Sequence, residues 1–378
     1  MKKCSVLVFC LVLFTSVNGQ FRAGVARKSI TPDTPMWLSG YASRTQPSTG
    51  VQHDIWVKAL AIEDNNKNRI VIVTTDILGL SHDISEEAAR RVIKAHGMER
   101  SQLLMSSSHT HSAPVIWPAL SVIFDLNQAD QQAAMRYAEK LTDSIVEAVA
   151  LSFADMVPAQ LSYGRGEAGF SVNRREATDK GVVIGINAEG PVDHSVPVLK
   201  VTDMTGKVKA ILFGYTCHNT TSRTYLINGD YSGFAQLEVE KMYPDATAMY
   251  IAGCGADQNP NPRGTLELAA EHGKTLADAV GKALNGELIT LRPPVRTSYT
   301  VTDLHFKPVD PAVYRNEMTG SDIYMQRRAR LILEAYNKGW DMSTYKYPVQ
   351  AVRFNKDFTI LGLTGEVVID YAIAARKR

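Results

Sequence analysis

The chain has 378 residues, of which 45% are hydrophobic and 21% are charged, and its formal net charge is only +2. This composition is typical of a soluble globular protein, and its length allows one large core or two domains. Because no basic run interleaved with aromatic residues accompanies the near-neutral charge, we expect no nucleic-acid partner.

The first twenty residues have the layout of a secretory signal peptide. Lys2 and Lys3 precede an apolar stretch that ends near Phe14, and small and polar residues follow. We therefore predict a signal peptide over residues 1–19 and a mature chain over residues 20–378. The apolar stretch is too short to span a bilayer comfortably, and no other segment is long enough. The sequence predicts an exported protein, periplasmic or extracellular, whose mature chain has no transmembrane segment.

Apolar, β-branched runs alternate with helical patterns along the next part of the chain. In residues 85–97, Ser85 is a candidate N-cap and Gly97 a stop signal. Residues 128–152 carry Met135, Leu141, Ile145 and Val149 at largely three-to-four spacing, which predicts one apolar face of a long helix. This alternation predicts an α/β fold with a mixed sheet flanked by helices. The predicted strands are 59–63, 70–75, 102–105, 196–202, 208–213 and 246–252, and further helices are predicted over 233–243 and 265–284.

The pattern changes after residue 291. Residues 292–306 look extended, residues 322–338 look helical, and the last thirty or so residues read as a hairpin that turns on Asn355–Lys356 and leads into a helix. No long linker rich in proline, glycine or serine interrupts the chain, and no internal repeat is present. We therefore expect one principal domain over residues 20–378.

Two cysteines, Cys217 and Cys254, remain in the predicted mature chain. In an exported protein they permit one disulfide, and two buried thiols are an equal alternative. This number is too small for a disulfide-stabilised scaffold.

Polar side chains follow several predicted strands at the point where each strand ends. In the stretch "SSSHTHSAP", His109 and His111 come after one apolar run, His218 follows another, and Glu366 follows the last hairpin. Ligand sites in open α/β sheets gather at such strand ends. Each residue also has an ordinary structural alternative: His218 as a hydrogen-bonded loop residue, Glu366 in the first turn of a helix, and Asp76 as a cap.

Taken together, three imidazoles and a carboxylate are the donors that zinc prefers. Zn²⁺ lowers the pKa of a coordinated water to about 7, which gives hydrolysis at neutral pH without a serine nucleophile. The sequence contains no GxSxG elbow, P-loop or HExxH motif that would favour another mechanism. The pattern therefore predicts a zinc site.

Five stretches resemble the neutral/alkaline (non-lysosomal) ceramidases. "SSSHTHSAP" is close to the family's Thr-His-Thr-His-Ser-Gly-Pro, and the opening "AGVARKSITPDTPMWLSGYASRTQPSTGV" is similar to its N-terminal signature. "YTCHNTTS", "NGDYSGFA" and "YGRGEAGFSVNRRE" resemble further segments, so the resemblance runs from about Ala23 to Ala374. It implies the catalytic-domain fold of that family and hydrolysis of the amide bond of N-acylsphingosine, a lipid substrate.

The resemblance also implies roles for individual residues. His109 and His218 match the zinc histidines, and Glu366 matches the zinc carboxylate, so the implied cofactor is Zn²⁺. His111 matches a histidine beside the metal that can transfer protons. Arg174 matches a substrate-contacting arginine that follows an asparagine.

The sequence departs from the family pattern in two places. Where the family has Gly-Asp-Val-Ser-Pro-Asn with an active-site serine, this chain reads "GADQNPN", which puts Gln258 or Asn259 in the serine's place. The family's fourth zinc ligand, a downstream tyrosine, has no counterpart, because the chain ends twelve residues after Glu366. We therefore expect a catalytic domain without the family's C-terminal immunoglobulin-like domain, and a chain that is truncated or completes its site otherwise.

These departures leave three functions open. The leading hypothesis is an exported zinc-dependent amidohydrolase of ceramidase type, in which His111 acts with Asp257 and Gln258 and the substrate is bound by Arg174 and Arg263. Arg263 is included because its planar guanidinium can bind a substrate carboxylate. The alternatives are a zinc-dependent hydrolase acting on a glycan-derived small molecule and a non-catalytic binding protein on the same fold.

Overall fold

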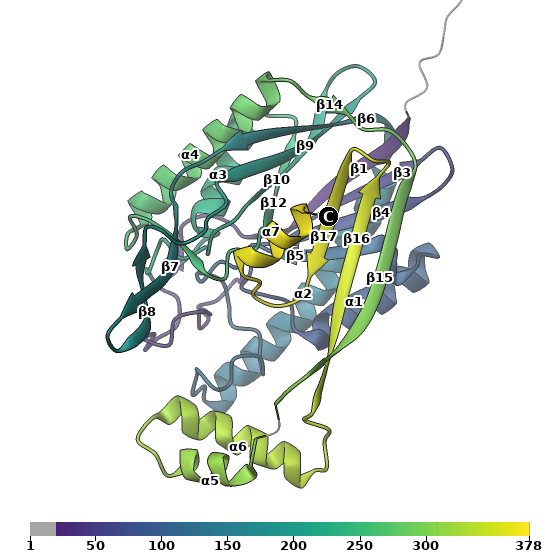
Figure 1. Cartoon of the computed structure of the whole chain (residues 1–378). Coiled ribbons are helices and arrows are strands. Elements are labelled where there is room, and N and C mark those ends of the chain that lie inside the picture. The colour runs from purple at the N-terminus through teal and green to yellow at the C-terminus, as the bar shows by residue number, and fades with distance from the viewer. Residues whose placement is uncertain (1–19, 308, 378) are drawn as a thin grey trace, which may run out of the picture.

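The computed structural model describes residues 20–307 and 309–377, and the predicted signal peptide lies outside this part of the chain. At its centre is a nine-stranded sheet made of β1 (Phe21–Ser29), β3 (Trp56–Asp64), β4 (Arg69–Thr75), β5 (Leu103–Ser107), β6 (Val157–Glu167), β9 (Ser195–Asp203), β10 (Val208–Tyr215), β12 (Thr247–Ala252) and β14 (Ile289–Thr290). The strand order is β12-β10-β9-β6-β1-β3-β4-β5, and β14 pairs with β6 (Figure 1). The pairs β4–β5 and β10–β12 are parallel and the others antiparallel, which confirms the predicted mixed sheet.

The sheet is strongly curved, so that β12 approaches β5 and β4 although β12 and β5 stand at opposite ends of the strand order. Leu60 of β3 therefore shares one buried cluster with Leu212 of β10 and Met249 of β12, inside the curve. Helices cover the outer face, where Ala59 packs among residues of the first two helices and Tyr250 among residues of the next two. These helices are α1 (His82–His96), α2 (Gln128–Ala154), α3 (Asp230–Met242) and α4 (Leu266–Asn285).

A second sheet covers the opening of the curve. It has the order β15-β16-β17, and its Val352 and Phe354 join the inner cluster. The predicted hairpin at Asn355–Lys356 and the helix after it are both confirmed. Figure 1 shows α7 in front of the curved sheet and the pair α5–α6 projecting away from it. The elements are β15 (Val295–His305), α5 (Pro311–Met318), α6 (Ile323–Asn337), β16 (Thr344–Phe354), β17 (Phe358–Leu363) and α7 (Ile369–Arg376).

The remaining elements are short or peripheral. A three-stranded sheet has the order β13-β7-β8, and its β7–β8 hairpin extends outward from the body (Figure 1). A two-stranded parallel pair joins the N-terminal region to the segment before α3. These elements are β2 (Gly50–Val51), η1 (Arg100–Gln102), β7 (Ser171–Thr178), β8 (Gly181–Asn187), β11 (Leu226–Ile227) and β13 (Gln258–Pro260).

All six predicted strands are confirmed, and three details of the predicted helices are wrong. Helix α1 begins one turn earlier than expected, because the N-cap is Ser81, whose hydroxyl accepts a hydrogen bond from the Ile84 amide. Ser85 lies inside the helix and donates to the His82 carbonyl instead. Gly97 ends the helix in the left-handed conformation, as predicted.

In α2 the predicted apolar stripe is confirmed at three of its four positions, since Leu141, Ile145 and Val149 are buried. Met135 is the exception. It is 43% exposed, and the neighbouring Ala134 faces the core in its place. The helix predicted over 233–243 begins three residues earlier, at Asp230. Within the described residues, no helix has the length and apolar character needed to cross a membrane.

The packing of α2 on β1 leads to a stability prediction. A Cβ atom at Gly24 would lie 2.2 Å from the Ser152 carbonyl oxygen and 2.7 Å from the Asp155 carbonyl carbon. We expect Gly24→Ala to lower the free energy of unfolding by about 1–3 kcal/mol, because this helix end must shift. Urea denaturation measures the change, and Gly169→Ala, where nothing lies within 4 Å, is the matched control. Equal urea midpoints for the two variants would contradict the close packing of α2 against Gly24.

Candidate metal centre

The loop after β5 holds His109 and His111. Its backbone is fastened to the end of β4, because the Ser108 amide donates to the Thr75 carbonyl at 2.8 Å and the His109 amide donates to the Ile77 carbonyl at 3.0 Å. His109 has φ 62°, a left-handed conformation that is uncommon for a residue with a side chain. Such conformations cluster at functional sites, where surrounding hydrogen bonds hold them.

The loop after β10 holds His218, and Asn219 ties this loop to the first one. The Asn219 side-chain amide donates to the Ser108 carbonyl at 2.8 Å, and the His111 amide donates to the Asn219 carbonyl at 3.3 Å. His218 is only 4% exposed. The two histidine-bearing loops are therefore held together by backbone and amide hydrogen bonds rather than by the imidazoles themselves.

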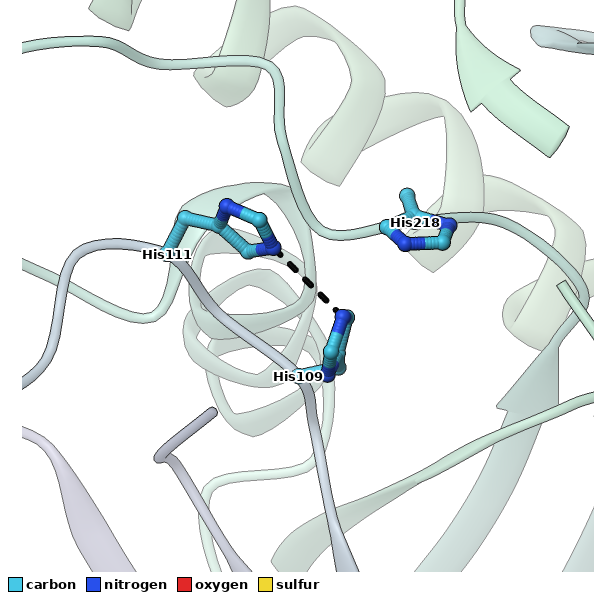
Figure 2. A group of neighbouring side chains, drawn as sticks. All are labelled: His109, His111 and His218. Carbon is cyan, nitrogen blue, oxygen red and sulfur yellow. Dashed lines mark hydrogen bonds between the residues drawn. The ribbon is translucent and has the colours of Figure 1, made fainter. Parts of the chain in front are cut away.

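The three imidazoles converge, and we call His109, His111 and His218 the histidine cluster (Figure 2). One ligand atom from each ring lies within 4.8 Å of the others, and the Nε2 atoms of His109 and His111 are 3.4 Å apart. Nδ1 of His109 is 2.8 Å from the Leu78 carbonyl, and Nδ1 of His218 is 2.7 Å from the Gly255 carbonyl. Because a carbonyl only accepts, both Nδ1 atoms donate and both Nε2 atoms keep a free lone pair when the rings are neutral.

Glu366, on the loop between β17 and α7, adds a carboxylate to the cluster. Its two oxygens lie 3.1 Å from Nε2 of His218 and 3.8 Å from Nε2 of His109. The proximity of His218, followed by the charges of His109 and Arg174, lowers the pKa of Glu366 to about 2, so the carboxylate is ionised at neutral pH. Burial lowers the pKa values of His109 and His111, which favours neutral rings.

This donor set fits a zinc ion. Zinc takes imidazole nitrogen and carboxylate oxygen as ligands, and the ligands must be deprotonated to bind. His109 and His218 have their second nitrogen fixed by a backbone carbonyl, which is the usual way in which zinc histidines are oriented. The residues that would hold the metal are thus His109, His218 and Glu366, with His111 alongside them.

Asp257 and Gln258 make hydrogen bonds that fix the segments around the site, and the Gln258 carbonyl accepts from the His218 amide at 3.0 Å. Asp257 accepts from the Ile369 amide at 3.1 Å, at the first turn of α7, and lies 3.4 Å from the side-chain amide of Asn173. Gln258 is fully buried, and its side-chain oxygen accepts from the Ser171 hydroxyl at 2.8 Å. These contacts anchor α7 and β7 through Asp257 and Gln258, and the catalytic roles suggested by the sequence stay predictions.

Arg174 and Arg263 lie at the edge of the site and are joined through two neutral residues. Arg174 donates to the Asn259 side-chain oxygen at 3.3 Å, and Arg263 donates to the Thr220 hydroxyl at 3.4 Å. Thr220 in turn lies 3.5 Å from the same Asn259 oxygen. Thr220 comes two residues after His218, so both guanidinium groups lie close to the histidine cluster.

Sequence analysis did not single out Tyr41 and Arg44, which also belong to the site. The Tyr41 ring lies 4.9 Å from the His111 ring, and Arg44 donates to the His111 carbonyl at 2.8 Å. Both residues fall in a stretch quoted above only for its family resemblance. No local pattern there indicates that the chain passes behind His111.

A cavity of about 1320 Å³ lies between the curved sheet and the second sheet, and it reaches the metal centre. His109, His218 and Glu366 line one part of it, and neither His111 nor any of the arginines above lines it. Much of the remaining lining is aliphatic or aromatic. It includes Leu78, Leu80, Leu104, Met105, Ile116, Leu199, Leu212, Phe358 and Ile360.

Cys217 and Cys254 are free thiols, which decides between the two alternatives left by the sequence. Cys217 is buried, and Cys254 is partly exposed on the cavity wall. Neither sulfur belongs to the group of described residues that could hold a metal ion.

Fold and site together define an α/β protein with a candidate metal centre built from loops at the ends of its strands. Residues 21–266 match the family model described as neutral/alkaline non-lysosomal ceramidase, N-terminal. The chain therefore belongs to this ceramidase family, as its motifs predicted.

Comparison with individual proteins gives the extent of the similarity. The chain is 26% identical over 248 residues to a neutral ceramidase of Mycobacterium tuberculosis, and 25% identical over 251 residues to one of Pseudomonas aeruginosa. These matches cover 61% and 62% of this chain but only 38% and 37% of the relatives, so the chain spans little more than a third of their length. The crystal structure of the Pseudomonas aeruginosa enzyme has the same fold, with a TM-score of 0.74 at 17% identity over 95% of this chain and 64% of that one.

Proposed function

We propose that this protein is an exported zinc-dependent hydrolase that cleaves the amide bond of an N-acylsphingosine-like lipid. The observation that carries the proposal is the convergence of His109, His111, His218 and Glu366 at the end of a largely apolar cavity. The relatives named above are neutral ceramidases, and the chain belongs to their family. Export rests on the signal-like pattern of residues 1–19.

Each residue of the site has a separate role in amide hydrolysis. When bound to His109, His218 and Glu366, Zn²⁺ supplies the Lewis acidity that makes water a nucleophile at neutral pH and polarises a carbonyl. His111 lies beside the ligands and delivers a proton to the departing amine, which leaves readily only when protonated. Leu78 and Gly255 keep two of the rings in the tautomer that a metal requires.

The apolar part of the cavity lining favours a lipid over a glycan-derived substrate. The aliphatic lining offers burial to a hydrocarbon chain, which contributes about 0.8 kcal/mol for each CH₂ group taken out of water. A glycan-derived substrate would leave its hydroxyl groups without hydrogen-bond partners against Leu199, Leu212 and Ile360. The cavity therefore supports a lipid amide as the substrate.

Removal of the metal tests this proposal. We expect zinc to copurify at about one equivalent per chain, since the donor set provides a single site. A chelator should abolish the release of fatty acid from ceramide in detergent micelles, and added Zn²⁺ should restore it. Elemental analysis and mass spectrometry of the products provide the measurements.

Two outcomes would contradict the proposal. A protein that binds no zinc when it is added after gentle purification has no such centre. Hydrolysis that continues unchanged in the chelator does not depend on a metal. A chain that binds zinc and takes up lipid without any hydrolysis would instead support the non-catalytic alternative.

A further inference from the structure

Four arginines surround the polar side of the metal centre without an acidic partner. Their hydrogen bonds go only to neutral oxygens, and within residues 20–307 and 309–377 no carboxylate oxygen lies within 4.0 Å of any of their nitrogens. Guanidinium groups that are partly removed from water without a counter-ion carry a desolvation cost. An anion in their midst would offset this cost. The four residues are Arg44, Arg174, Arg223 and Arg263.

Two of these arginines, Arg174 and Arg263, are placed so that both can bind one anion. Arg174 and Arg263 are both partly buried, and the acceptors Asn259 and Thr220 connect them in one chain of contacts between 3.3 and 3.5 Å long. Each guanidinium uses one donor there and has further N–H groups to offer. Planar donor arrays of this kind bind carboxylate, phosphate and sulfonate groups through paired hydrogen bonds.

The other two add positive charge next to Tyr41. The guanidinium carbons of Arg44 and Arg223 lie 5.2 and 5.8 Å from the centre of the Tyr41 ring. The Tyr41 ring in turn lies 4.9 Å from the His111 ring. Positive charge is thus concentrated near the histidine cluster, and none of these four arginines lines the apolar cavity.

Two buried acids lie in this region, Asp230 and Asp257, and neither forms an ion pair with Arg174 or Arg263. The Asp257 carboxylate accepts from the Ile369 amide at 3.1 Å and lies 3.4 Å from the Asn173 side-chain amide. Asp230 is fully buried and accepts hydrogen bonds from the backbone amides of Thr221, Ser222 and Tyr231 at 3.1, 2.8 and 2.7 Å. Its oxygens are therefore engaged in holding the loop after β10. Glu366 faces the histidines, where it belongs to the metal site.

We propose that the substrate is an N-acyl amine that carries an anionic group close to its amide bond. Arg174 and Arg263 bind this anion, and the hydrocarbon chain lies in the cavity on the other side of the metal centre. This inference deepens the proposed function and rests on it. It sets the preferred substrate apart from neutral ceramide, whose hydroxyl groups carry no charge for the arginines to bind.

A matched pair of substrates tests the inference on the zinc-loaded full chain. N-dodecanoyltaurine and N-dodecanoylethanolamine share an acyl chain and differ in a sulfonate against a hydroxyl. We expect kcat/KM to be about 10- to 100-fold higher for the taurine conjugate, the range that corresponds to hydrogen bonds with a charged group. Ceramide and ceramide 1-phosphate, compared in the same way, show whether the anion belongs to a single-chain or a sphingoid amide.

Substitutions of Arg263 test whether this residue causes the preference for the anionic substrate. Arg263→Gln should remove most of the preference, measured as the ratio of kcat/KM for N-dodecanoyltaurine to kcat/KM for N-dodecanoylethanolamine. Arg263→Lys should recover part of the preference, because it restores the charge without the planar fork. Arg136→Gln, an exposed arginine on α2, is the control and should behave as the wild type.

Binding to the metal-free protein separates this inference from the proposed function. In a chelator, titration calorimetry should detect binding of N-dodecanoyltaurine that weakens in Arg263→Gln and at high salt. If the protein binds the taurine conjugate in this way but does not hydrolyse it after zinc is restored, the proposed function is wrong and the anion site is supported. Equal kcat/KM values for the charged and neutral substrates, or binding unaffected by Arg263→Gln, would overturn the anion site and leave the zinc hydrolase standing.

Discussion

Replacement of His109 by alanine is expected to lower kcat/KM for lipid amide hydrolysis by about 10³-fold or more, because loss of a ligand removes several kcal/mol of transition-state stabilisation. Bound zinc should fall well below one equivalent per chain. His109 contributes an Nε2 atom that lies 3.4 Å from that of His111 and 3.8 Å from Glu366. Its side chain is 19% exposed, so the substitution leaves no large buried cavity.

The matched control is His272→Ala. His272 is also a buried histidine, but it stacks on Phe170 and hydrogen-bonds to the Pro262 carbonyl, away from the histidine cluster. We expect this variant to lose stability while keeping its zinc and most of its activity. Thermal unfolding with and without added Zn²⁺ gives a second readout, since zinc should raise the melting temperature of His272→Ala but not that of His109→Ala. Full zinc content in His109→Ala would rule out His109 as a ligand.

The sequence identified the imidazoles and Glu366 because strand ends are readable from apolar runs. It could not show that these ends meet, since β5 and β12 occupy opposite ends of the strand order. Only the curvature of the sheet brings the loops after β5, β10 and β12 together. Curvature depends on how distant side chains pack inside the sheet, and no local pattern records it.

Two strands of the central sheet that sequence analysis missed, β1 and β6, have a common physical character. Strand β1 contains Arg22, Arg27 and Lys28, and β6 contains glycines at 164 and 166, so neither presents a clear apolar run. The glycines at 164 and 166 are required by the close approach of α4, because a Cβ at Gly166 would lie 2.3 Å from the Ala279 carbonyl oxygen. Tertiary contact thus fixes residues that weaken the local strand signal.

The alternative reading of Asp76 as a structural residue is supported by its contacts. It accepts hydrogen bonds from the Trp56 amide and the Gln236 side-chain amide, both at 3.0 Å, and it is buried. Asp257 and Gln258 also make such contacts, although their predicted catalytic roles stay predictions. A polar residue at a strand end is therefore a poor indicator of chemistry by itself, and the imidazoles were the informative residue type.

Lys58→Ala is expected to lower the free energy of unfolding by about 3–5 kcal/mol, the cost of breaking a buried ion pair by removing one partner. The Lys58 side chain is only 3% exposed and donates to the Gln236 and Glu240 side chains and the Ala248 carbonyl, at 2.9, 3.2 and 2.7 Å. Burial lowers the pKa of this ammonium group, and the charges of Glu240 and Asp76 oppose that shift. Chemical denaturation measures the loss.

The comparison is with Lys67→Ala in the turn between β3 and β4. Lys67 pairs with Glu63 at the surface and its side chain is 74% exposed, so this variant should change stability by less than about 1 kcal/mol. Lys58→Met separates charge from volume, because methionine fills the space without the ammonium group. We expect it to remain strongly destabilised, since Glu240 and the Ala248 carbonyl still lack their donor. Recovery of most of the stability would show that packing alone matters here.

The same lysine connects stability to the metal centre. Lys58 projects from β3 across the curve to α3 and β12, and Gln236 extends the network to Asp76 at the end of β4. These contacts hold the two ends of the curved sheet together, which is the condition for the loops after β5 and β10 to meet. We therefore expect Lys58→Met to bind zinc more weakly than the wild type even under conditions where it is fully folded. Unchanged zinc affinity in that variant would mean that Asn219 and the neighbouring loop hydrogen bonds suffice to hold the histidine cluster in place.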